Sequence, residues 1–185
     1  MMIASMNNQL IKCFEDEFGN IETGIESTRN HCVQIVKYHA KENSPQFVST
    51  LGLSSAENIT GHIKCEWIME FSPKLVSNHA ASMLDYFLSL YLDGKLGKIL
   101  RGSYLQFSKK DDRIWKNDNS KGIYFTIPVL RSQGFQKSMA NTGVVPIWVV
   151  PITGFEIEIL NNKGWKALEG YWDKNDVDLH TTFRI

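Results

Sequence analysis

The clearest pattern along the chain is a strict alternation of apolar and polar positions over residues 63–71, IKCEWIMEF. The odd-numbered positions of this segment are apolar, whereas Lys64, Glu66 and Glu70 lie on the opposite face. A period of two sustained over this length predicts a β-strand. Shorter runs rich in β-branched and aromatic residues predict further strands at residues 32–38, 46–53, 102–108, 122–129 and 145–152.

Two segments repeat their apolar residues at the three- and four-residue steps of an α-helix. In residues 7–19 the repeat includes Leu10, Phe14 and Phe18, and a glycine ends it. A longer repeat predicts a helix over residues 78–92, closed by Gly94. Helices are therefore expected at the start and in the middle of the chain.

Residues 144–160, VVPIWVVPITGFEIEIL, admit two interpretations. Alternation over residues 155–159 would extend the preceding strand. However, Pro151 has no N–H group and fits poorly inside a central strand. Thr153 followed three residues later by Glu156 also has the spacing of a capping box, in which each side chain accepts a hydrogen bond at a helix start. We favour a strand that ends near the proline and a helix that follows.

The segment GWKALEGYW, residues 164–172, places Trp165, Leu168 and Trp172 on one helical stripe and predicts a further short helix. The chain shows no internal repeat and no linker rich in proline, glycine and serine. We therefore predict one domain over residues 1–185, of the α+β (mixed α/β) class. Its central β-sheet should have about five or six strands flanked by helices.

The balance of charge and the absence of known motifs limit the kinds of function that the protein can have. Lys and Arg together number 20, as do Asp and Glu, whereas proteins that bind long nucleic acids usually carry a basic excess. The sequence contains no His-Glu-x-x-His, Cys-x-x-Cys or Gly-x-Ser-x-Gly motif and no phosphate-binding glycine loop. We expect no catalytic residues, no metal, no cofactor and no direct contact with nucleic acid. An enzyme built on scattered acidic residues remains an alternative.

The location of the protein is predicted from two absences in the sequence. The N-terminus lacks a charged leader followed by an apolar run. No apolar stretch approaches the ~18 residues that a membrane-spanning helix needs. We therefore expect a cytoplasmic protein that does not contact the membrane.

Four segments resemble the suppressor of fused (SUFU) domain family. FVSTLGLSSAEN (47–58) is similar to its Thr-x-Gly-Met/Leu-Ser segment, and KCEWIMEFSP (64–73) is similar to the strand that follows. WVVPITGFEIEILNNKGWKAL (148–168) resembles its strand, Pro-Ile/Leu-Thr turn and paired short helices. DVDLHTTFRI (176–185) resembles its C-terminal Asp-to-Arg segment, with Arg184 as the arginine. The resemblance runs from about residue 33 to 184, and residues 1–20 are less clearly matched.

The resemblance implies a SUFU-like fold and two kinds of function. In animals the domain belongs to an adaptor that holds a transcription factor. In bacteria many such proteins are immunity proteins, which bind and neutralise polymorphic or contact-dependent growth inhibition toxins. We expect the immunity function here, through a 1:1 complex that occludes a cognate nuclease toxin. The alternative is a SUFU-like adaptor or scaffold with another protein partner. Because fold alone does not fix function, this step rests on analogy.

The uneven distribution of charge suggests where such a toxin would bind. Residues 1–26 have a net charge of minus four and residues 151–180 minus three, whereas residues 101–131 hold seven basic residues against three acidic ones. A nuclease presents a basic face to phosphate, so an acidic patch on its inhibitor would speed encounter. The predicted toxin-binding residues are Glu15, Asp16, Glu17, Glu169, Asp173 and Asp176. The alternative is that these side chains are merely solvated.

Overall fold

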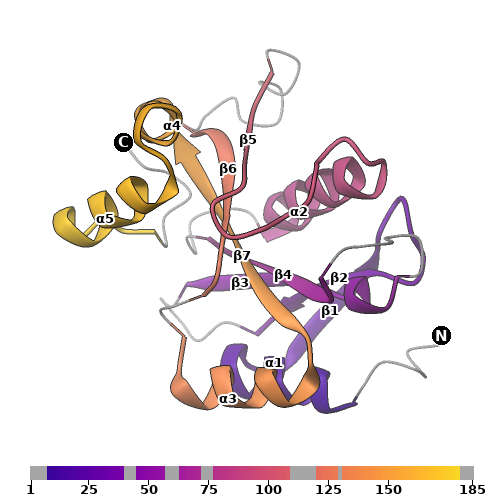
Figure 1. The fold of residues 1–185 in the computed structure, drawn as a ribbon. Coiled ribbons are helices and arrows are strands. Elements are labelled where there is room, and N and C mark those ends of the chain that lie inside the picture. Colours follow the sequence, from indigo (N-terminus) through magenta and orange to yellow (C-terminus); the bar gives the residue numbers. More distant parts are fainter. Residues whose placement is uncertain are drawn as a thin grey trace.

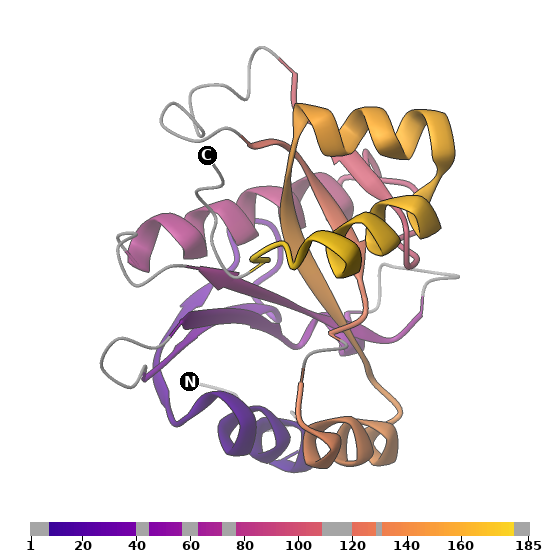
Figure 2. The ribbon, with the colours of Figure 1, turned by 90° about the vertical axis from the view of Figure 1, so that its left-hand side faces the viewer.

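Seven strands form one mixed sheet in the order β1-β2-β3-β4-β7-β6-β5 (Figures 1 and 2). The computed structural model describes residues 8–39, 45–56, 63–71, 77–108, 120–128 and 131–179. The strands within them are β1 (Ile21–Glu26), β2 (Gln34–Tyr38), β3 (Gln46–Leu51), β4 (Cys65–Phe71), β5 (Tyr104–Gln106), β6 (Ser120–Thr126) and β7 (Val145–Thr153). The helices are α1 (Asn8–Phe18), α2 (Ser77–Leu92), α3 (Gln133–Thr142), α4 (Gly154–Lys163) and α5 (Trp165–Asn175), with a short 3₁₀ turn η1 (Leu53–Ser55).

The sheet consists of two antiparallel units joined by one parallel pair. β1 to β4 form a meander in which each strand pairs with the next. β5, β6 and β7 form the second antiparallel unit. β4 and β7 run parallel, with Cys65 opposite Val145 and Ile68 opposite Trp148. A parallel pair needs a long crossover, and this one contains α2 and the first two strands of the second unit.

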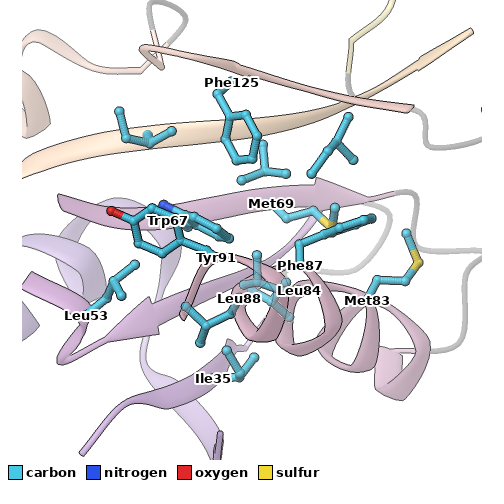
Figure 3. Packing of buried hydrophobic residues seen from close by; sticks show 14 of the residues in the cluster. Ile35, Leu53, Trp67, Met69, Met83, Leu84, Phe87, Leu88, Tyr91 and Phe125 are labelled. Atoms are coloured by element: carbon cyan, nitrogen blue, oxygen red, sulfur yellow. The ribbon is translucent and has the colours of Figure 1, made fainter. Parts of the chain in front are cut away.

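One face of the sheet is covered by α2 (Figure 3). Trp67 and Met69 of β4 point to this side, where the helical spacing of Leu84, Phe87 and Tyr91 presents a continuous apolar stripe. The rings of Trp67 and Tyr91 have centroids 5.2 Å apart. The period-two pattern of the strand and the helical pattern of α2 therefore meet in the largest core cluster.

Four helices cover the opposite face in two pairs. α1 and α3 pack against each other over β2 to β4, with the ring centroids of Phe14 and Phe135 5.8 Å apart. α4 and α5 pack over β6 and β7 and bury Leu168 and Trp172. Figure 1 shows the pairs at separate places, α1 and α3 below the sheet and α4 and α5 at the upper left.

The polar positions of β4 are buried as well, because both faces of this central strand are covered. Glu66 has no exposed surface and accepts hydrogen bonds from the hydroxyls of Thr50 (2.7 Å) and Ser54 (2.7 Å). The backbone N–H groups of Gly52, Leu53 and Ser54 donate to it at 3.0–3.2 Å. Burial raises the pKa of Glu66, against these five donors. One carboxylate thus fixes the η1 turn to the sheet.

Glu70, the second polar residue of β4, pairs with Arg131 from the segment before α3. Arg131 Nη2 lies 2.6 Å from Glu70 Oε2, and both side chains are largely buried. The guanidinium also lies 4.9 Å from the ring centroid of Phe47 and 5.9 Å from that of Trp148. This ion pair connects the middle of the sheet with the segment before α3. The neighbouring aromatic rings favour the positive charge of the guanidinium.

The predicted α+β class is confirmed, with seven strands in the sheet rather than five or six. Each of the six predicted strands is present, and the seventh is β1 at the edge. Sequence periodicity missed β1 because five of its six residues are exposed. It also missed α3, which buries only Phe135 and Met139.

The predicted capping box is present and the strand interpretation of residues 155–159 is wrong. Thr153 Oγ1 accepts from the N–H of Glu156 (3.3 Å), and the Glu156 carboxylate accepts from the N–H of Thr153 (2.7 Å). The expectation for Pro151 needs correction, because β7 continues through it to Thr153. Pairing with β4 extends only to Trp148. Beyond that point β7 has a partner on one side only, so a missing N–H is tolerated.

Candidate functional site

A cleft of about 450 Å³ lies between α5 and the ends of β6 and β7. One wall comes from α5, the floor from Thr126 and Trp148, and the rim from Arg101 and the segment that follows α5. Glu169 and Asp173 are four residues apart and share one side of the helix. Asp176, which caps the C-terminus of α5 with a φ of 47°, lines the same cleft. We call this the α5 cleft; its lining residues are Arg101, Thr126, Trp148, Glu169, Trp172, Asp173, Asp176, Val177 and Leu179.

Glu169 is the centre of a hydrogen-bond network in the α5 cleft. Its carboxylate faces the guanidinium of Arg101, with Nη2 at 2.5 Å and Nε at 3.2 Å. The hydroxyls of Tyr124 (2.9 Å) and Thr126 (2.8 Å) donate to the same carboxylate. Two-pronged contact of this kind between arginine and a carboxylate fixes geometry as well as charge.

The network determines the ionisation of its members. Burial alone would raise the pKa of Glu169, but hydrogen bonds from Arg101, Thr126 and Tyr124 hold the pKa below its ordinary value. The hydrogen bond to Glu169 raises the pKa of Arg101 in turn. Burial, with the hydrogen bond to Glu169, raises the pKa of Tyr124. Glu169 is therefore ionised at neutral pH, and its charge is matched by Arg101.

Arg101 is also held by an aromatic ring of α5. Its guanidinium carbon lies 4.9 Å from the ring centroid of Trp165, a cation–π distance. Gly102 makes this contact possible, because a Cβ there would come within 2.6 Å of the Trp165 ring. Trp165 and Glu169, four residues apart on one helix, thus enclose the same guanidinium.

Two tryptophans form the apolar part of the α5 cleft. Trp172 is 5% exposed, and its indole Nε1 donates to Glu156 Oε1 at 2.5 Å. Its ring meets that of Tyr124 edge-on, at 5.3 Å between centroids. Trp148 is 2% exposed and joins the same apolar cluster. The capping glutamate of α4 therefore positions a wall of the cleft on α5.

Asp173 and Asp176 differ from Glu169 in having exposed side chains. Within the described part of the chain, neither carboxylate has a hydrogen-bond or ion-pair partner. Both lie at the C-terminal end of α5, where the helix dipole adds partial negative charge. Since Arg101 is matched by Glu169, the two aspartates give the lining residues of the α5 cleft an excess of negative charge.

The three predicted residues of α1 lie elsewhere. Glu15 accepts from the backbone N–H of Ile21 (3.1 Å), and Glu17 accepts from the N–H (3.2 Å) and hydroxyl (2.6 Å) of Ser132. Asp16 is exposed. α1 and α5 cover different halves of the sheet (Figures 1 and 2), so the six predicted residues do not form one patch. Four of the seven basic residues in segment 101–131 lie outside the described residues.

Sequence reasoning missed six of the nine lining residues, namely Arg101, Thr126, Trp148, Trp172, Val177 and Leu179. Trp148 and Trp172 had been assigned only to a strand and a helical stripe. The available signal was the spacing of Glu169 and Asp173, which share one side of a helix, with Asp176 just beyond its end. The partners from β6, β7 and the turn at Arg101 are brought there by tertiary structure alone.

A second cavity, of about 280 Å³, is almost wholly apolar. It lies between α3 and the ends of β6 and β7, where Ile127 and Val145 are each more than a third exposed. We call it the apolar groove; its lining residues are Ile127, Pro128, Gln136, Met139, Ala140, Val144, Val145 and Pro146.

The described residues contain neither a metal-binding cluster nor a membrane-spanning helix. Within the described ranges, His, Cys, Asp and Glu side chains form no group of three that could hold a metal ion. None of the helices there is both long enough and apolar enough to span a bilayer.

Comparison with known proteins identifies what the chain is similar to. Residues 29–184 match the sequence profile described as Suppressor of fused protein (SUFU). No curated protein sequence matches the chain significantly. The fold is similar to that of a SUFU homologue from Neisseria gonorrhoeae, with a TM-score of 0.69, 15% identity and coverage of 97% of this chain and 95% of that one. It is also similar to a chain of a Sufu–Fu complex, with a TM-score of 0.63, 10% identity and coverage of 96% and 88%.

Proposed function

This chain belongs to the suppressor of fused family, and from that premise we propose that it is a protein-binding domain whose partner docks at the α5 cleft. One solved structure of the same fold is a Sufu–Fu complex, which supports a function in binding another protein. The observation that carries the proposal is the pair of exposed carboxylates of Asp173 and Asp176, which lie beside two tryptophans and have no partner among the described residues. Interfaces commonly combine aromatic anchors of this kind with a polar rim.

The specific function that we propose is immunity against a toxin. The chain binds a cognate polymorphic or contact-dependent growth inhibition toxin, which is a nuclease, and occludes it in a 1:1 complex in the cytoplasm. A nuclease active site is basic because it must attract phosphate. The excess of negative charge in the α5 cleft is complementary to such a face and would accelerate encounter. The protein itself needs no turnover for this action.

The test is a titration of toxin activity. The product of the neighbouring upstream gene is purified with this protein, and nuclease activity is measured as the protein is added. Occlusion predicts an end point near one equivalent, because a tight complex blocks each toxin molecule once. Protection of many toxin molecules by one protein would instead support an enzyme. A neighbouring gene product that neither binds nor has toxic activity would contradict the immunity function.

The apolar groove favours a second candidate, an adaptor or scaffold with a different protein partner. Exposed apolar cavities of this size suit an apolar side chain of a bound segment. An adaptor would bind through the groove without inhibiting any activity of its partner. Substitution of Val145 by Asp, compared with a substitution of Asp173, would separate the two, because each removes binding at only one of the two surfaces.

A further inference from the structure

We propose that the α5 cleft takes one arginine side chain of the partner, held by Trp172, Asp173 and Asp176. The inference rests on the proposed protein-binding function and specifies the group that the partner supplies. It comes from a repeat of residue types along α5 and its C-terminal cap rather than from the acidic residues alone. Trp165 is followed four residues later by Glu169, and Trp172 is followed four residues later by Asp176.

The first copy of this repeat already holds an arginine of the chain itself. Arg101 lies over the ring of Trp165 at 4.9 Å, and its guanidinium contacts the carboxylate of Glu169 at 2.5 Å and 3.2 Å. A planar guanidinium can stack on an aromatic ring and pair with a carboxylate at once, which an ammonium group does less well. The first copy therefore shows which side chain this arrangement suits.

The second copy has the same kinds of side chain, but only its tryptophan lies within the helix. Trp172 follows Trp165 by seven residues, an offset of only about 20° around the axis. Asp176 follows the last residue of α5 and has a left-handed φ of 47°. Trp172 and Asp176 both line the α5 cleft, and Asp173 adds a second carboxylate. Unlike Glu169, these aspartates have no partner within the described ranges.

The charge of the α5 cleft also favours a positively charged ligand. Arg101 is matched by Glu169, and Arg131, near the floor at Trp148, is matched by Glu70. The aspartates are therefore not neutralised by either arginine. Lys174 lies one residue further along the helix than Asp173, about 100° around the axis. An incoming guanidinium would thus find two carboxylates that no described residue pairs with, and an apolar wall for its methylene groups.

The experiment uses the full chain without a partner. N-acetyl-arginine methylamide is titrated into the ¹⁵N-labelled protein, and the indole resonance of Trp172 and the backbone resonances of residues 172–177 are followed by NMR. The neutral isostere N-acetyl-citrulline methylamide is the control ligand. We expect saturable shifts at these residues with the arginine compound only. Equal shifts with both compounds, or none with either, would overturn the proposal.

Two variants show whether the carboxylates carry the binding. Asp173→Asn and Asp176→Asn remove one charge each, and we expect each to weaken binding about two- to fivefold. Asp16→Asn on α1 is the matched control, since it removes an equally exposed aspartate and should change nothing. A loss of affinity in Asp16→Asn as large as that of the α5 variants would show that the net charge of the protein, and not the cleft, determines binding. Because no toxin is used, a negative result in this test does not decide the outcome of the immunity titration. A negative result in the titration does not decide the outcome of this test either.

Discussion

The indole N–H of Trp172 donates to the carboxylate of Glu156 at 2.5 Å, which connects the first turn of α4 with a wall of the α5 cleft. The same carboxylate accepts from the backbone N–H of Thr153. One glutamate therefore caps the start of a helix and orients a cleft-lining residue on the next helix. A local feature that is visible in the sequence, Thr-x-x-Glu, has a consequence for the candidate site that the sequence does not show.

The first prediction concerns the cap alone. Thr153→Ala removes the side-chain acceptor for the N–H of Glu156. We expect it to lower the free energy of unfolding by about 0.5–2 kcal/mol, as loss of an N-cap usually does. Urea denaturation measures this value. An unchanged midpoint would mean that the cap contributes nothing to the stability of α4.

The second prediction concerns both functions of Glu156. Glu156→Ala removes the acceptor for Thr153 and for Trp172, so it should cost more stability than Thr153→Ala, by about 1–3 kcal/mol. It should also weaken binding of the arginine compound, whereas Thr153→Ala should not. The comparison of the two variants by denaturation and by NMR separates helix capping from positioning of the tryptophan.

The third prediction concerns the pH dependence that Glu169 confers. Its pKa in the folded protein is below the ordinary value of 4.5, so the ionised carboxylate stabilises the fold above that pH. This contribution is lost as the pH falls through the lower, folded-state pKa. The stability difference between wild type and Glu169→Gln should therefore be largest near neutral pH and shrink below pH 4.5.

The control for this prediction is the same substitution in an Arg101→Gln background, where Glu169 has lost its charged partner. There the Glu169→Gln stability difference should vary less over the same pH range. A Glu169→Gln difference that stayed constant down to strongly acidic pH would show that Arg101 does not stabilise the ionised form.

The fourth prediction concerns the buried carboxylate of Glu66. Glu66→Gln replaces an oxygen by an NH₂ group that faces hydrogen-bond donors from the η1 turn. Because buried donors would lose their acceptor, we expect a loss of more than about 2 kcal/mol in the free energy of unfolding. Glu158→Gln, at an exposed position of α4, should change stability by less than about 0.5 kcal/mol.

The fifth prediction rests on the proposed immunity function and concerns association with the toxin. The double variant Asp173→Lys/Asp176→Lys should slow association at low salt by about tenfold or more and flatten its dependence on ionic strength. Stopped-flow measurements at several salt concentrations give both quantities. Asp16→Lys tests the α1 residues in the same way. If only this variant slows association, the contact lies on α1 and not at the α5 cleft.

The helices and strands with the strongest sequence patterns were predicted most accurately. β4 and α2 combine long, regular periodicity with large apolar residues and were found with nearly correct bounds. β1 offers only Ile21 and Ile25 as apolar residues and is held by pairing with β2, which no local pattern reveals. α3 depends on a serine cap at Ser132, and a lone serine is a weak signal.

Only the part of the candidate site that α5 and its C-terminal cap contribute could be predicted from the sequence. Glu169 and Asp173 lie on α5 and can be read from their spacing, and Asp176 is the residue that caps its C-terminus. Glu169 nevertheless differs from the other two, because Arg101 reaches it from a turn far away in the sequence. The burial of Glu66 and Glu70 was hidden for a similar reason, since alternation in a strand does not tell whether its polar side faces water or another helix.

The arrangement of the sheet in two units also determines when the α5 cleft can exist. All of its lining residues belong to residues 101–179, the second antiparallel unit and the helices that follow it. The β1–β4 meander, by contrast, is complete once residue 71 has been made. A ribosome that synthesises this chain therefore releases the elements of the meander first and the lining residues of the cleft later. A nascent chain can form the α5 cleft only after residue 179 has been made, and truncated products that lack α5 also lack this cleft.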